Sequence, residues 1–188
     1  MTSRASVPGD ERLRLFLALR VPEDVLDEVD RWRRQLTAGR LVAREHLHVT
    51  LAFLGLRPAS ELGAIVDALR GAAFRSGGGI RLTLDRYRET RSVGMLVLAD
   101  EGGRAASLAD DLQGRLEALG VFRRERRPWL PHLTVVRWRD RPRLRPEPPP
   151  RRTFVPSDAA AYLSRLRPGG AEYRILASVV LGGNVGGE

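Results

Sequence analysis

The chain has 188 residues, of which 43% are hydrophobic and 29% charged, a composition typical of a folded globular protein and not of a disordered one. It contains no cysteine, which excludes disulfide bonds and cysteine-ligated metals. The formal net charge is +9 and every basic side chain is arginine, so either an acidic partner such as RNA or a coding bias toward arginine accounts for the excess of positive charge.

The first half of the chain alternates between strand-like and helix-like patterns. Residues 13–21 form an apolar run with the length of a buried strand, and a helix is predicted from Pro22 to a stop at Gly39. Residues 47–54 predict a second strand, and an amphipathic helix follows Pro58.

The middle of the chain repeats these patterns. The glycines at 77–79 predict a loop, and the alternation over 80–84 predicts a half-buried strand. Residues 93–99 predict another strand, residues 108–119 a third helix that ends at a glycine, and residues 133–138 a further strand.

The last part of the chain begins with a segment rich in proline and arginine over residues 142–150, which predicts an exposed extended loop. Residues 154–166 and 173–181 predict two closing strands, joined by a turn at 168–170.

The predicted elements suggest a bilobal domain. The order strand, helix, strand occurs over 13–54 and again over 93–138, which favours two similar lobes related by a pseudo-twofold axis, with their sheets facing one another. We expect residues 11–182 to form this single domain, with flexible tails at 1–10 and 183–188. No segment has the length of a signal peptide core or of the ~20 apolar residues of a membrane span, so we expect a cytoplasmic protein without membrane contact.

Two copies of a His-x-Thr pattern carry the main functional signal. The chain has only three histidines, and two of them begin such a motif, His48-Val49-Thr50 and His132-Leu133-Thr134. Residues i and i+2 of a strand point to the same face, so each strand presents an imidazole and a hydroxyl to one side. If the lobes face each other, two imidazoles and two hydroxyls converge on one site.

This set of groups suits the opening of a cyclic phosphate. One imidazole can be neutral and take a proton from water while the other is protonated and donates to the departing ribose oxygen. The threonine hydroxyls can donate hydrogen bonds to the non-bridging oxygens of phosphorus. Two histidines without further ligands make a poor zinc site, and no cofactor or metal is expected. The alternative for either motif alone is a core histidine beside a threonine that favours strands.

The residues also resemble a known family. RLFLALRVP near the start, HLHVTLAFLG at 46–55, PHLTVVRW at 131–138 and YLSRLRPGGAEY at 162–173 are similar to the two-histidine phosphoesterases, and in particular to the LigT-like RNA 2′,3′-cyclic phosphodiesterases, also called 2′-5′ RNA ligases. The resemblance implies an α+β fold with two antiparallel sheets around a central cleft and helices packed outside. It also implies metal-independent hydrolysis of RNA 2′,3′-cyclic phosphate ends to 2′-phosphates.

The resemblance implies roles for individual residues as well. It gives catalytic roles to His48 and His132, with His48 as the acid and His132 as the base, although spacing alone does not distinguish the two. It gives phosphate-binding roles to Thr50, Thr134 and Arg137. Arg137 is an odd number of residues from His132, so it reaches the site only if the strand bulges or ends near residues 135–136.

Other residues are weaker candidates for the cleft. The arginines of residues 123–127 could steer an RNA backbone and Trp129 could stack on a base, but a solvated charged face and a core tryptophan are the alternatives. The resemblance also places Tyr173 and Arg165 near the cleft. His46 is predicted at the rim, where the family often has asparagine, and strict alternation places Phe53 on the packing face.

Three functions are therefore compared. The first is hydrolysis of RNA 2′,3′-cyclic ends by a monomer whose partner is an RNA or oligonucleotide with such an end. The second is 2′-5′ ligation or the cleavage of other cyclic or 2′-linked nucleotides on the same site. The third is a non-catalytic RNA-binding domain, which the presence of both intact motifs disfavours.

Overall fold

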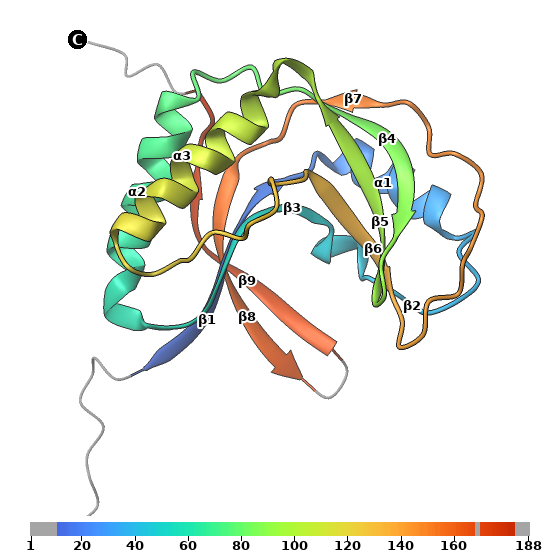
Figure 1. The fold of residues 1–188 in the computed structure, drawn as a ribbon, viewed down its shortest axis with the longest axis horizontal. Helices are drawn as coiled ribbons and strands as arrows, with labels where there is room; N and C mark the ends of the chain where they lie inside the picture. Colours follow the sequence, from blue (N-terminus) through green and yellow to red (C-terminus); the bar gives the residue numbers. More distant parts are fainter. Residues whose placement is uncertain (1–10, 168–169, 183–188) are drawn as a thin grey trace, which may run out of the picture.

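The computed structural model describes residues 11–167 and 170–182, and within them three α-helices pack against strands that pair antiparallel throughout (Figure 1). In chain order the elements are β1 (Arg12–Arg20), α1 (Glu23–Arg33), β2 (Arg40–Leu41), β3 (His48–Pro58), α2 (Leu62–Arg75), β4 (Leu82–Glu89), β5 (Val93–Asp100), α3 (Arg104–Ala118), β6 (His132–Arg137), β7 (Thr153–Phe154), β8 (Ala159–Arg167) and β9 (Gly170–Val179). The prediction of an α+β fold is confirmed. Both predicted tails, and the first two residues of the predicted turn at 168–170, lie outside the described residues.

The strands form two halves that meet at β3 and β6. Their order is β7-β4-β5-β6-β3-β1-β8-β9, with β2 added on β6. The pairing between β3 and β6 consists of one residue pair, Val49 with Leu133, so the two predicted sheets are joined into one hydrogen-bonded path at this point. Each half contains the two strands of one predicted strand-helix-strand unit, β1 with β3 and β5 with β6, and each unit ends in a strand that begins with a His-x-Thr motif.

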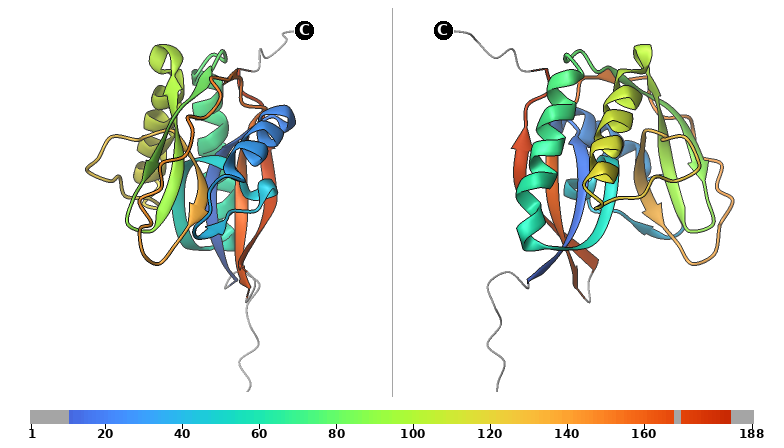
Figure 2. Two further views of the ribbon diagram at one scale, coloured as in Figure 1. Left: turned by 90° about the vertical axis from the view of Figure 1, so that its right-hand side faces the viewer. Right: turned by 60° about the vertical axis from the view of Figure 1, so that its left-hand side comes forward.

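The helices cover the sheet on the side away from the histidines. Helices α2 and α3 lie side by side, whereas α1 lies against the other half, where the Trp32 ring packs 5.8 Å from that of Tyr87 on β4 (Figures 1 and 2). The core between the helices and the sheet includes Leu17, Leu112 and Leu133, each fully buried. Burial of this apolar face fixes which side chains of β3 and β6 point to the opposite side.

Two elements differ from the sequence prediction. Helix α1 ends at Arg33, well before Gly39, and the chain then forms the short strand β2 beside β6. Gly39 has a φ of +86°, and a Cβ there would lie 2.7 Å from the carbonyl oxygen of Arg137, so only glycine permits this approach. The strand predicted over 154–166 is divided into β7 and β8, because Pro156 cannot donate to a sheet.

The extended loop predicted over 142–150 is confirmed, since residues 138–152 contain no helix or strand. Among the residues that the structure describes, no helix is long and apolar enough to cross a membrane.

Candidate functional site

The two His-x-Thr motifs come together where the halves of the sheet meet. Val49 pairs with Leu133, and the antiparallel register of that pair brings His48 beside Thr134 and Thr50 beside His132. Val49 and Leu133 are fully buried in the core, so the four motif side chains point to the opposite, helix-free face. The convergence predicted from the spacing thus arises from direct pairing of the two motif strands.

Both imidazoles are oriented by the same backbone contact. His48 Nδ1 lies 2.7 Å from the carbonyl oxygen of His46, and His132 Nδ1 lies 2.8 Å from that of Leu130. A carbonyl oxygen only accepts hydrogen bonds, so each Nδ1 donates and carries the hydrogen. Each Nε2 is left for the site, where it accepts a proton if the ring is neutral and donates one if the ring is charged.

Aromatic side chains pack around His48. Its ring stacks on Phe16, with the centroids 4.8 Å apart, and Phe16 stacks in turn on Tyr162 at 4.8 Å. Tyr173 meets the His48 ring edge-on at 5.6 Å and lies 4.4 Å from the ring of His46. These aromatic rings hold His48 in one orientation and remove water from it.

Burial lowers the pKa of His48 to about 4, because the apolar surroundings disfavour the charged imidazolium. The hydrogen bond to the backbone of His46 opposes this shift, and the positive charges of His46, His132 and Arg137 add to it. His132 and Arg137 are therefore within electrostatic reach of His48. At neutral pH the free protein holds His48 neutral, the protonation state of a base.

This shift predicts a pH dependence of folding stability. The unfolded chain protonates His48 near pH 6.5 and the folded chain only near pH 4. The stability that comes from keeping His48 neutral is therefore complete above pH 6.5 and is lost as pH falls from 6.5 to 4. We expect the free energy of unfolding to fall by up to about 3 kcal/mol more over this range in the wild type than in His48→Gln. Denaturant titrations at a series of pH values measure the difference. Parallel stability curves for the two proteins would contradict the shift.

Arg137 reaches the site face because β6 bulges. Met95 of β5 pairs with Thr134 and the adjacent Gly94 pairs with Val136, which leaves Val135 as an extra residue on β6. Val135 and Val136 are both fully buried, so the alternation shifts by one residue and Arg137 shares the face of Thr134. The bulge expected near residues 135–136 is confirmed. Arg137 is exposed, and its guanidinium group makes no hydrogen bond or ion pair with any other residue that the structure describes.

A second bulge corrects the placement of Phe53. Ala18 of β1 pairs with Thr50 and Leu17 with Ala52, so Leu51 is the extra residue on β3. Phe53 therefore lies on the face of Thr50, 5.8 Å from the Phe16 ring and 64% exposed. The prediction that Phe53 belongs to the packing face is wrong, because alternation does not continue through a bulge. No local sequence signal marks this bulge.

Two side chains of the other half hold β3 at this bulge. The indole nitrogen of Trp129 donates to the carbonyl oxygen of Thr50 at 2.9 Å, and the amide of Gln113 on α3 donates to that of Leu51 at 2.9 Å. The strands β3 and β6 pair at one position only, so these two carbonyl groups have no hydrogen-bond partner on β6. The side chains of Trp129 and Gln113 supply the missing donors. Trp129 thus fixes the backbone of Thr50, and its side chain also lines the cleft.

A cavity of about 680 Å³ opens beside the motifs. Its walls include Thr50 and His132, the exposed Phe53, and Arg88 and Met95 from the second half of the sheet. His48, Thr134 and Arg137 are not among the lining residues. They lie on the same face of β3 and β6 as Thr50 and His132, outside the walls of the cavity.

The remaining predicted residues divide between the cleft and the surface. Arg123 and Arg127 line the cavity, whereas the Arg124 guanidinium forms ion pairs with Asp110 and Glu117 on α3. Arg165 follows Ser164 on β8, so alternation places it on the face opposite to that of Tyr162 and it is not part of the cleft.

No group of three or more histidine, aspartate or glutamate side chains that could hold a metal ion occurs within residues 11–167 and 170–182. The polar groups of the site are imidazoles, hydroxyls and a guanidinium, which suit an anionic ligand better than a cation.

Comparison with known proteins gives one family and several relatives. Residues 21–166 match the model of the 2′-5′ RNA ligase superfamily. The chain is 33% identical over 133 residues to the RNA 2′,3′-cyclic phosphodiesterase of Escherichia coli, covering 68% of this chain and 73% of that protein. The crystal structure of TT0787 of Thermus thermophilus matches with a TM-score of 0.78 and 26% identity, covering 91% and 99%. That of E. coli LigT complexed with NADP+ matches with a TM-score of 0.74 and 27% identity, covering 92% and 100%.

Proposed function

The chain belongs to the 2′-5′ RNA ligase superfamily, and from this membership we propose that it hydrolyses 2′,3′-cyclic phosphate ends of RNA to 2′-phosphates without a metal. The relative from E. coli is named RNA 2′,3′-cyclic phosphodiesterase. The observation that supports the proposal best is that equivalent backbone contacts orient the two imidazoles on paired neighbouring strands, each with its Nε2 left for a ligand.

The proposed reaction uses one imidazole as base and the other as acid. The base takes a proton from water, whose oxygen attacks phosphorus opposite the ribose 3′ oxygen. The bond between phosphorus and the 3′ oxygen breaks, and the acid gives its proton to that oxygen. The products are a 2′-phosphate and a free 3′ hydroxyl, and the proton that the base gained balances the one that the acid lost.

The two histidines repel each other's charge, which helps to keep one proton on the pair. The positive charge of His132 contributes to the low pKa of His48, so the state with one neutral and one charged ring is favoured over the doubly charged state. The acid role that the resemblance gives to His48 requires the bound phosphate to raise the pKa of His48, as a neighbouring anion does.

Thr50, Thr134 and Arg137 are proposed to bind the phosphate. The two hydroxyls lie beside the imidazoles in the register of β3 and β6, and the guanidinium projects from the end of β6 on the same face. Donors fixed in these places stabilise the negative charge that grows on the non-bridging oxygens in the transition state. Both motif strands belong to one chain, so we propose that a monomer contains the complete site.

The proposal is tested with chelator-treated protein and a nucleoside 2′,3′-cyclic phosphate as substrate. We expect full turnover to the 2′-monophosphate, resolved from the 3′ isomer by anion-exchange chromatography. Formation of the 3′-monophosphate, or activity that returns only when a divalent cation is added, would contradict it. The same assay with RNA fragments that carry cyclic and 5′-hydroxyl ends separates hydrolysis from ligation, and RNA binding without any product would indicate a non-catalytic domain.

A further inference from the structure

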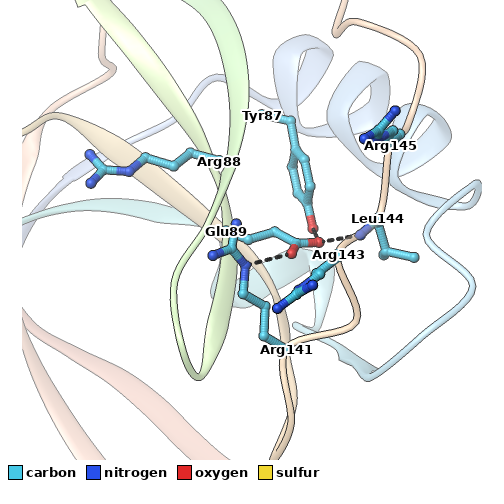
Figure 3. Close-up of a pocket in the computed structure, with 7 residues that line it drawn as sticks. All are labelled: Tyr87, Arg88, Glu89, Arg141, Arg143, Leu144 and Arg145. Atoms are coloured by element: carbon cyan, nitrogen blue, oxygen red, sulfur yellow. Dashed lines mark hydrogen bonds and ion pairs between the residues drawn. The ribbon is translucent and has the colours of Figure 1, made fainter.

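A second cavity, of about 720 Å³, lies against β4 (Figure 3). Tyr87 and Glu89 line it from β4, and Arg141, Arg143 and Arg145 line it from the loop that connects β6 to β7. The cavity is thus basic, with one carboxylate among several guanidinium groups. Neither the sequence motifs nor the proposed reaction uses it.

Glu89 of β4 binds the loop between β6 and β7 and fixes its position. Its carboxylate side chain is only 3% exposed, pairs with the Arg141 guanidinium at 3.0 Å, and accepts hydrogen bonds from the Leu144 backbone at 2.7 Å and the Tyr87 hydroxyl at 3.3 Å (Figure 3). Burial raises the pKa of Tyr87, so its hydroxyl stays protonated and remains a donor. The carboxylate is fully engaged by these three groups, which leaves the other arginines of the cavity without an acidic partner there.

The loop is fixed on both sides of these arginines as well. The Trp138 indole donates to the carbonyl oxygen of Arg91 at 3.0 Å. Trp32 of α1 donates to the carbonyl oxygen of Glu147 at 3.0 Å, and the side chain of Gln35, just after α1, accepts from the Glu147 N–H at 2.7 Å. Prolines at 142 and 146 restrict the chain further. The segment between these anchors therefore presents its side chains from a rigid backbone.

Arg143 and Arg145 are the side chains that this segment presents. Neither forms a hydrogen bond or an ion pair with another residue in the described part of the chain. Arg143 has a φ of +57°, and no other non-glycine residue within 11–167 and 170–182 has a positive φ. Glycine or asparagine suits this conformation better than arginine does, so the strain points to a function of the guanidinium.

Arg88 connects the second cavity with the histidine cleft, because it lines both. It lies between Tyr87 and Glu89 and projects to the other face of β4, away from the Glu89 carboxylate (Figure 3). On that face Arg88 pairs with Met95, and Met95 pairs with Thr134. Neighbouring strands are roughly 4.8 Å apart, so Arg88 stands about 10 Å from the second motif along one line across the sheet.

We propose that the second cavity binds backbone phosphates of the RNA strand that leads to the cyclic end. The inference rests on the proposed function, since a 2′,3′-cyclic phosphate occupies the 3′ end and the strand continues from it on the 5′ side. The strand passes from the histidines to Arg88, crosses β4, and places phosphates at Arg143 and Arg145. Phosphates are the partners that paired guanidinium groups on a rigid backbone recognise best.

The test uses the variant Arg143→Gly/Arg145→Gln in the full chain. Its control, Arg75→Gln/Arg174→Gln, removes the same charge from exposed sites on α2 and β9 that line neither cavity. Glycine relieves the strain at position 143, so we expect the melting temperature of the test variant to be unchanged or raised. Turnover of a nucleoside 2′,3′-cyclic phosphate is expected to match the wild type, because the motif residues are intact.

A longer substrate is expected to respond. For a single-stranded oligoribonucleotide with a 2′,3′-cyclic end, we expect KM to rise several-fold in the test variant and not in the control. Loss of two phosphate contacts lowers the salt slope of binding by about 1.4, and fluorescence anisotropy of the same strand with a 3′ hydroxyl measures this slope. Equal KM values and equal slopes in the two variants would overturn the proposal.

Two further outcomes remain distinct from these. If the wild type cleaves no cyclic end but binds the strand with a steeper salt slope than the test variant does, the proposed function fails. The proposal that the second cavity binds RNA phosphates is then retained. If the test variant is less inhibited by inorganic phosphate than the control while both bind the oligonucleotide equally, the cavity takes free phosphate and the RNA assignment is overturned.

Discussion

Replacement of either His48 or His132 by alanine is expected to lower kcat for a nucleoside 2′,3′-cyclic phosphate by about a thousand-fold. Each single variant removes one partner of the proton transfer, so the remaining imidazole can no longer complete the reaction. The double variant is expected to be little slower than either single one, since groups that act as a unit are not additive. Initial rates at saturating substrate, with chelator present, measure all three.

His46→Ala is the control for this series. His46 contributes its carbonyl oxygen to orient His48, and alanine retains that backbone contact. Its side chain packs on Tyr173 outside the pair of motifs, so we expect kcat to stay within a few-fold of the wild type. Undiminished turnover in His48→Ala or in His132→Ala would refute the roles proposed for the two imidazoles.

Replacement of Thr50 and Thr134 by valine is expected to give the second largest effect. Valine has nearly the shape of threonine and also favours strands, so the pairing of β3 with β6 is retained and only the hydroxyls are lost. Loss of a donor aimed at transition-state charge costs roughly a hundred-fold in kcat. We expect Thr50→Val to be the more severe of the two, because Thr50 lines the cleft directly.

The matched control is Thr37→Val, which alters an exposed threonine in the segment after α1. Stopped or continuous assays of the cyclic nucleotide give kcat and KM for each variant. An effect on KM alone, with kcat unchanged, would mean that the hydroxyls bind the ground state and the transition state equally well.

The central part of the site could be predicted from the sequence because its signal is local. Two motifs with the spacing of one strand face identify His48, Thr50, His132 and Thr134, and the pairing of Val49 with Leu133 brings the motifs together. The position of Arg137 could be predicted only on the condition that β6 bulges or ends early. Arg137 is an odd number of residues from His132, so a regular strand would turn it away from the site, and the pairing of β5 with β6 shows the required bulge at Val135.

The remaining features depend on contacts between distant segments. The bulge at Leu51 that turns Phe53 toward the site arises from the register of β1 with β3 and from the hydrogen bond that Gln113 supplies to it. The strand β2 exists because Gly39 lets the chain approach β6. The second cavity likewise requires Glu89 to meet a loop more than 50 residues further along the chain. Periodicity within one segment carries no information about such contacts.

The most direct test of the proposed site is an experimental structure of the wild-type protein with a nucleoside 2′-monophosphate, the proposed product. We predict that the phosphate lies between the motifs, with oxygens roughly 2.6–3.2 Å from both Nε2 atoms of His48 and His132 and within hydrogen-bond reach of Thr50 and Thr134. A phosphate that contacts only one of the two imidazoles, or that binds only at Arg143 and Arg145, would contradict the account.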